Sequence, residues 1–139
     1  MDSLEKKIKH LAKVFEEEFP EIAFAYLFGS MAEGKAKKSS DTDIAVYLKP
    51  YKKSPELIAK IIGSVENVFD KSPCDLLILN DAGVLIAKEA IKGKIVFIRK
   101  SAMDDYAGFY SIICRKYEDK IVWMKKQLEY RGYEVQWDN

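Results

Sequence analysis

Residues 23–48, AFAYLFGSMAEGKAKKSSDTDIAVYL, contain two short apolar runs joined by a polar, lysine-rich loop. The runs at 24–28 and 44–48 are rich in aromatic and aliphatic residues and are bounded by Gly, Ser and Asp. Short apolar runs with these flanks favour buried strands over turns of helix. The stretch therefore predicts a strand, a tight turn, a loop and a second strand.

Small and acidic residues stand where these two strands end and begin. Gly29 and Ser30 follow the first strand, and Asp41 and Asp43 lead into the second. Side chains two apart in a strand share a face, so we expect both carboxylates on one side, with Cα atoms roughly 6.5–7 Å apart. Carboxylates hold Mg²⁺ together with water and substrate phosphates, and a glycine turn with a hydroxyl can bind phosphate oxygens. The stretch therefore predicts a site for a nucleotide and its metal ions.

Each half of this pattern also has an ordinary structural explanation. A Gly-Ser pair is usually a turn, and Asp-x-Asp before a strand is usually a solvated loop end. Here, however, ten residues, 31–40, separate the two halves. Gly-Ser, ten residues and Asp-x-Asp together resemble the signature of the DNA polymerase β-like nucleotidyltransferase superfamily. The resemblance covers about residues 23–98, and the short chain is most similar to the minimal nucleotidyltransferases, which are encoded beside HEPN-domain ribonuclease toxins.

The resemblance implies both a fold and a set of site residues. The fold is α/β (α+β), a single mixed sheet of about four strands flanked by helices, with a long C-terminal helix. Asp41 and Asp43 would hold one or two Mg²⁺ ions, and Gly29 and Ser30 would seat the phosphates of ATP. In the superfamily a third carboxylate on a neighbouring strand completes the metal site and can act as the base. Asp75 is the residue that resembles it.

The resemblance also implies a function. The chain would transfer AMP from ATP to a tyrosine hydroxyl of a cognate HEPN toxin and so inactivate its ribonuclease. One alternative is an antitoxin that acts by binding alone, although the presence of all three acids argues against a vestigial site. Another alternative is a small-molecule nucleotidyltransferase of the aminoglycoside type, which would need a dimer to build its second half.

Length and composition limit the other possibilities. We expect one domain, 1–139, with a catalytic core at about 23–98 and a C-terminal helix at about 103–131. The balance of 23 basic and 22 acidic residues lacks the basic excess of proteins that bind long nucleic acid. No apolar run approaches the ~18–20 residues of a membrane span, and the N-terminus is charged, so we expect a cytoplasmic protein. Cys74 and Cys114 are expected to be reduced and to bind no metal.

Other chemistries lack their motifs. The chain has no Walker-type loop and no nucleophile elbow, and its one histidine, His10, stands on a lysine-rich helical face. P-loop and triad mechanisms are therefore excluded. The loop lysines, Lys35, Lys37 and Lys38, are expected to be solvated, or one of them screens the triphosphate.

The patterns before and after this stretch predict further elements. Ser3 or Asp2 caps a first helix that ends before Pro20, and Ser54 caps a helix that runs to about residue 69. The run CDLLIL at 74–79 is so apolar that it predicts a central strand.

Asp75 stands at the head of that strand, where a buried carboxylate is costly unless it is paired or binds a metal. Asp70 and Asp81 are poorer candidates for the third acid because both lie in connecting segments. Asn80 and Asp81 are expected to cap a helix at 82–92, and a strand follows at 94–98.

A long helix is expected from Asp104 to about Tyr130. Its apolar stripe steps by three or four residues through Tyr106, Tyr110, Ile113, Tyr117, Ile121, Met124 and Leu128. Packing of this stripe on the chain's own sheet is the favoured interpretation, while Phe109 and Trp123 leave a second face for a partner. A homo-oligomer is a separate alternative that the sequence leaves open. Residues 133–137 alternate like a short strand that could pair with a sheet edge.

Overall fold

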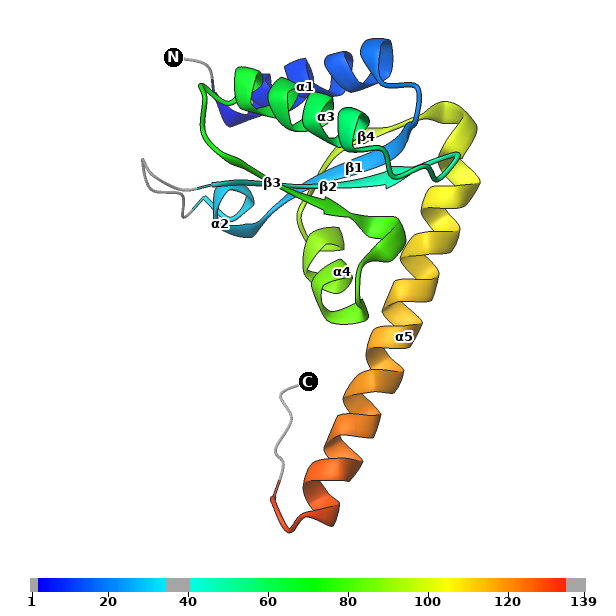
Figure 1. Ribbon diagram of the computed structural model, residues 1–139. Helices are drawn as coiled ribbons and strands as arrows, with labels where there is room; N and C mark the ends of the chain where they lie inside the picture. The colour runs from blue at the N-terminus through cyan, green and yellow to red at the C-terminus, as the bar shows by residue number, and fades with distance from the viewer. Residues whose placement is uncertain (1–2, 35–40, 135–139) are drawn as a thin grey trace.

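The computed structural model describes residues 3–34 and 41–134. Within these residues one sheet has helices on both of its faces (Figure 1). The strands are β1 (Ile22–Phe28), β2 (Thr42–Leu48), β3 (Cys74–Ile78) and β4 (Lys94–Ile98). The helices are α1 (Leu4–Glu18), α2 (Gly29–Ala32), α3 (Pro55–Val68), α4 (Val84–Ile91) and α5 (Met103–Tyr130), and two short 3₁₀ turns are η1 (Leu79–Asp81) and η2 (Lys100–Ala102).

Serine caps set the starts of the two helices on one face. The Ser3 hydroxyl accepts a hydrogen bond of 3.3 Å from the Lys6 amide at the start of α1. The Ser54 hydroxyl accepts one of 3.4 Å from the Leu57 amide at the start of α3. These bonds satisfy amides that have no partner inside the helix. Both predicted caps are confirmed.

The sheet has the strand order β3-β2-β1-β4. β1 runs antiparallel to both β2 and β4, whereas β2 runs parallel to β3. The sheet is therefore mixed. The predicted fold, a four-stranded mixed sheet with flanking helices and a long C-terminal helix, is confirmed.

Two apolar cores lie on opposite faces of the sheet. α1 and α3 cover one face (Figure 1), where Leu11, Phe15 and Ile61 are fully buried. α4 and the first part of α5 cover the other face, over Phe24 and Ile113. Because the central strands are covered on both sides, β1 and β2 are nearly continuous apolar runs.

The prediction of a central strand at 74–79 is wrong. β3 ends at Ile78 and is an edge strand, paired with β2 alone among the described strands. Leu76 packs against the core under α1 and α3, and Leu77 packs against the core under α4 and α5. An apolar run shows that both faces of a strand are covered, but it does not show whether both edges are paired.

The prediction that Asn80 and Asp81 cap the next helix is also wrong, because α4 begins only at Val84. Instead, the Asn80 side chain accepts a hydrogen bond from the Leu48 amide and donates one to the Leu48 carbonyl, each 2.9 Å long. Asp81 accepts a hydrogen bond from the Tyr51 hydroxyl. Asn80 therefore holds the end of β2, and Asp81 holds the segment that follows it.

α5 packs against the sheet only along its first half. Ile113 is its one buried residue, and the rings of Tyr106 and Phe109 lie 5.4 Å and 5.7 Å from the Phe24 ring. The stripe residues after Tyr117 are only half-buried, and Figure 1 shows the helix running well past α4. No described helix is both long and apolar enough to cross a bilayer. The strand expected at 133–137 falls mainly outside the described residues.

Gly93 stands where the turn after α4 passes closest to β1. A Cβ atom on Gly93 would lie 2.2 Å from the Leu27 carbonyl oxygen and 2.9 Å from the Phe28 Cβ. Because these atoms can retreat only if β1 moves, Gly93→Ala should lower the free energy of unfolding by about 1–3 kcal/mol. Urea denaturation followed by circular dichroism measures this loss.

Gly63→Ala is the matched control. Gly63 is exposed in α3, and nothing lies within 4 Å of the Cβ that alanine would add. Alanine should therefore raise the free energy of unfolding there by about 0.5–1 kcal/mol. Equal effects of the two substitutions would contradict the close approach at Gly93.

Candidate active site

The Gly-Ser and Asp-x-Asp segments meet at one end of the sheet. Because β1 is antiparallel to β2, Phe28 at the end of β1 pairs with Asp43 near the start of β2. The parallel pairing of β2 with β3 then sets Asp43 beside Asp75. Gly29 follows Phe28 directly, so strand pairing brings Gly29, at the end of β1, beside Asp43 on β2 and Asp75 on β3. Neighbouring strands in a sheet are about 4.8 Å apart.

Gly29 lies directly against the carboxylate of Asp43. Its φ angle is +73°, and a Cβ atom there would lie 2.1 Å from Asp43 Oδ2 and 3.0 Å from Asp43 Cγ. A residue with a Cβ would meet both a strained backbone, costing about 1–2 kcal/mol, and a steric clash. The turn therefore needs glycine for two separate reasons.

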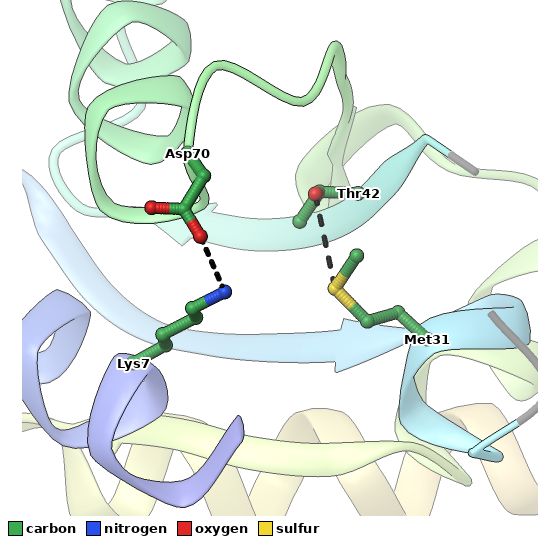
Figure 2. Close-up of polar contacts among 4 residues, drawn as sticks. All are labelled: Lys7, Met31, Thr42 and Asp70. Atoms are coloured by element: carbon green, nitrogen blue, oxygen red, sulfur yellow. Dashed lines mark hydrogen bonds and ion pairs between the residues drawn. The ribbon is translucent and has the colours of Figure 1, made fainter. Parts of the chain in front are cut away.

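A sulfur contact ties α2 to β2 beside this turn. Thr42 is fully buried, and its hydroxyl donates to the Met31 Sδ atom at 3.9 Å (Figure 2). Because side chains alternate along a strand, the burial of Thr42 on one face directs Asp41 and Asp43 to the other. Ser30 lies next to Met31 in α2 and is half-buried.

The three acids at this end of the sheet repel one another. Burial raises the pKa of Asp43 above its usual value, and the negative charges of Asp75 and then Asp41 raise it further. Asp75 and Asp41 therefore both lie within electrostatic reach of Asp43. A bound cation would relieve this repulsion and favour the charged form of Asp43.

The residues present fit Mg²⁺. Carboxylate oxygens are the hard ligands that Mg²⁺ prefers. The described residues contain no group of three His, Cys, Asp or Glu side chains close enough to hold a metal by themselves. Mg²⁺, however, usually binds one or two carboxylates and completes its octahedral shell with water and substrate phosphates. The site therefore suits a metal ion that arrives with a nucleotide.

Asp75 is exposed rather than buried, which corrects the prediction of a costly buried carboxylate at this position. The reason is that its strand lies at the edge of the sheet. Pairing with Asp43, and not burial, makes Asp75 a candidate third acid. Asp70, a poorer candidate from sequence, lies elsewhere, with its carboxylate 2.8 Å from the Lys7 Nζ atom (Figure 2).

A hollow of about 230 Å³ next to the turn is lined by two lysines, Lys92 and Lys94, that the sequence patterns did not identify as site residues. It is lined by Gly29, Ala32, Glu33, Glu89, Lys92, Gly93 and Lys94. Lys94 arrives there because β4 is antiparallel to β1 and pairs it with Leu27. Only a knowledge of the strand order could have revealed this. The three loop lysines considered from sequence, Lys35, Lys37 and Lys38, lie outside the described residues.

Cys74, next to Asp75, is not a candidate nucleophile. Burial, with smaller contributions from the charges of Glu66 and Asp75, raises the pKa of its thiol to about 12. The reactive thiolate is therefore scarce at neutral pH. Both cysteines are free, as expected.

Comparison with known families matches most of the chain. Residues 6–102 match the family model described as polymerase beta, nucleotidyltransferase. This range contains the whole sheet and all the candidate site residues. A search of the curated proteins gives no match.

Several solved structures resemble the chain along nearly its whole length. A chain of a toxin–antitoxin complex with AMP-PNP has a TM-score of 0.66 and 21% identity, covering 92% of this chain and 94% of that one. A chain from the complex of tri-AMPylated Shewanella oneidensis HEPN toxin with MNT antitoxin has a TM-score of 0.63 and 17% identity. The match covers 91% of this chain and 92% of that one. A chain of the toxin–antitoxin complex MntA–HepT has a TM-score of 0.63 and 17% identity, and the match covers 91% of this chain and 93% of that one. At these identities the likeness concerns the fold.

The repulsion around Asp43 predicts a pH dependence of stability. Because its pKa is raised in the folded protein, the fold binds the proton more tightly than the unfolded chain, and ionisation destabilises the fold. This penalty is absent below the usual aspartate pKa of 3.8 and complete above the raised value. In metal-free buffer, Asp43→Asn should therefore melt above the unsubstituted protein at pH 7, with a difference that disappears below about pH 3.8. Thermal melting followed by circular dichroism measures the difference in melting temperature at each pH.

Asp70→Asn is the matched control. Asp70 is ion-paired with Lys7, so neutralising it removes an exposed attraction of at most about 1 kcal/mol and should not raise the melting temperature. Added Mg²⁺ should stabilise the unsubstituted protein more than Asp43→Asn. A lower melting temperature for Asp43→Asn at pH 7 would mean that Asp43 is not under repulsion.

Proposed function

The chain belongs to the polymerase beta nucleotidyltransferase family, and we propose that it transfers AMP from ATP to a tyrosine hydroxyl of a cognate HEPN-domain toxin. The observation that carries this proposal is the arrangement of Gly29 against the Asp43 carboxylate, with Asp41 and Asp75 in electrostatic reach. Nucleotidyl transfer depends mainly on positioning and charge neutralisation rather than on covalent chemistry by the protein. The glycine turn and the carboxylates at this end of the sheet suit both positioning and charge neutralisation.

The similar structures support the choice of nucleotide and acceptor. One contains AMP-PNP, an ATP analogue, and another contains a tri-AMPylated HEPN toxin with an MNT antitoxin. This chain spans more than nine-tenths of each of those chains. We therefore assign ATP as the nucleotide and a HEPN toxin as the acceptor.

In the proposed reaction the tyrosine oxygen attacks the α-phosphorus of ATP. The new oxygen–phosphorus bond forms as the bond from the α-phosphorus to the oxygen that bridges to the β-phosphate breaks, and pyrophosphate leaves. Asp75, which is exposed, accepts the phenolic proton. The Ser30 hydroxyl and the backbone amides after Gly29 donate hydrogen bonds to the β- and γ-phosphates.

Asp41, Asp43 and Asp75 are the residues that would hold Mg²⁺. The metal, when bound, neutralises the charge of the triphosphate and polarises the reacting phosphoryl oxygens. The protein's own part is to keep the Asp43 carboxylate within electrostatic reach of Asp75 and Asp41 despite the repulsion. The hollow beside Gly29 also carries Lys92 and Lys94, and of these Lys92 is paired with Glu89 at 3.7 Å, so we assign screening of the leaving pyrophosphate to Lys94.

α5 supports a second candidate function, inhibition of the toxin by binding alone. Six of its large apolar side chains are exposed: Met103, Tyr110, Ile112, Val122, Trp123 and Tyr130. Exposed apolar residues along a helix that runs past the body of the domain fit contact with a protein partner. Such inhibition needs no chemistry at the three acids, so loss of an acid would leave it intact.

Incubation with ATP, Mg²⁺ and the product of the neighbouring open reading frame tests the enzymatic function. Intact mass of both proteins should show whole adenylyl units on the partner. Asp41→Asn and Asp43→Asn should each lower the rate more than about 100-fold, because even an outer-shell partner of a metal costs about 10–100-fold when removed. Asp70→Asn removes a carboxylate that is paired with Lys7 and does not contribute to the pKa shift of Asp43, so it should keep the full rate.

Each outcome of this assay decides between the candidates. No mass gain together with a stable, inactive complex would favour inhibition by binding alone. Full transfer in both Asn variants would reject Asp41 and Asp43 as the residues that hold the metal.

A further inference from the structure

One row of backbone groups on β3 points away from its only neighbouring strand among the described residues, β2. The Pro73 carbonyl accepts a hydrogen bond of 2.8 Å from the Thr42 amide, so the backbone of residue 73 faces β2. Because backbone groups alternate in direction along a strand, residues 75 and 77 also face β2. The amides and carbonyls of Cys74, Leu76 and Ile78 therefore point away from the sheet. No strand lies beyond β3 in the described part of the chain.

A groove of about 420 Å³ runs along this open edge. All five residues of β3 line it, together with Ile58 and Ile62 from α3 and Ala82 after η1. Aliphatic side chains form most of its wall. Its charges are Asp75 from β3 and the Lys53–Asp81 pair, whose atoms lie 3.5 Å apart. The groove thus leads directly to the candidate third acid.

We propose that the acceptor protein docks an extended segment along β3 as an added strand and presents its tyrosine at Asp75. This inference rests on the proposed function. An extended backbone matches the period-two row of donors and acceptors at Cys74, Leu76 and Ile78, whereas a helix has already paired its own backbone groups. The aliphatic wall of the groove receives alternate side chains of the docked segment.

The geometry of an added strand also explains why tyrosine is the acceptor. Asp75 and Asp43 point to the same face of the sheet because they are paired in register. A side chain of the added strand beside Asp75 points to that face too, but its backbone lies about two strand spacings, roughly 9–10 Å, from β2. A serine hydroxyl stays close to its own backbone, whereas a phenol reaches across Asp75 toward Asp43. The site therefore selects a long hydroxyl side chain.

The edge is too short to serve as a permanent interface between two copies of the chain. β3 has five residues, the backbone groups of only three of them point away from β2, and one of these three, Ile78, already forms the N-cap of η1. Stable interfaces bury about 1,200–2,000 Å² in total, well beyond what a five-residue strand provides. A short edge with a groove beside it suits a substrate segment that binds, reacts and leaves.

Amide hydrogen exchange followed by NMR tests the docking mode residue by residue. In the free protein, the amides of Cys74, Leu76 and Ile78 should exchange fast, while those of Asp75 and Leu77, bonded to β2, should be protected. The probe is the protein that becomes adenylylated in the assay above, with its acceptor tyrosine changed to phenylalanine so that it binds without reacting. On its addition with Mg²⁺ and AMP-PNP, the three outward amides should become protected in the same alternating pattern.

A groove variant supplies an independent readout. Ile62→Arg places a charge in the aliphatic wall and should raise the KM for the acceptor protein about tenfold or more, the usual effect of losing a central contact. Stabilisation by Mg²⁺ and AMP-PNP in a thermal melt should be unchanged, because Ile62 is not part of the nucleotide site. Leu85→Arg is the matched control, since Leu85 is 46% exposed on α4 and does not line the groove.

The outcomes separate this inference from the proposed function. Adenylylation of a partner whose binding leaves the three outward amides exchanging fast would overturn strand addition while leaving the enzyme activity intact. Protection of these amides in the protein alone, rising with its concentration, would show that a second copy occupies the edge and would also overturn it. Absence of any adenylylated protein would overturn the function and the inference together.

Discussion

The contact between the backbone of Gly29 and the carboxylate of Asp43 is the constraint on which the site depends. β1 can turn at its end because Gly29 adopts a φ of +73° and carries no Cβ where Asp43 Oδ2 lies. On the other side of β1, Gly93 comes equally close to the Leu27 carbonyl oxygen. With glycine on both sides, the start of β2 and the start of β4 both reach the end of β1. That convergence brings acids and lysines to one place.

The same convergence costs stability. Burial, and then the negative charges of Asp75 and Asp41, raise the pKa of Asp43, so ionisation of this carboxyl destabilises the folded protein. The two apolar cores on either face of β1 and β2 offset this repulsion. Repulsion between carboxylates favours the binding of cations, and therefore of a triphosphate that carries a metal ion.

Local patterns were sufficient where the important residues are neighbours in the chain. The turn at Gly29 and the acid at Asp43 follow from the stretch at 23–48, as the cap at Ser54 follows from its own few residues. Pairing between strands that are distant in the sequence determines the exposure of Asp75 and the position of Lys94. Asp75 is exposed because β3 lies at the edge, and Lys94 reaches Gly29 because β4 pairs with β1. Periodicity reports which faces of a strand are covered, but it carries no information on which strands pair.

The most direct test of the nucleotide site uses Mn²⁺, which shares the oxygen ligands of Mg²⁺ and broadens nearby NMR lines. With AMP-PNP present, the account predicts broadening centred on the amides of Gly29, Ser30, Asp43 and Asp75. The amide of His10, on α1, should stay sharp. Broadening centred instead on Glu18 and Glu21, which line a separate hollow of about 330 Å³, would contradict the account.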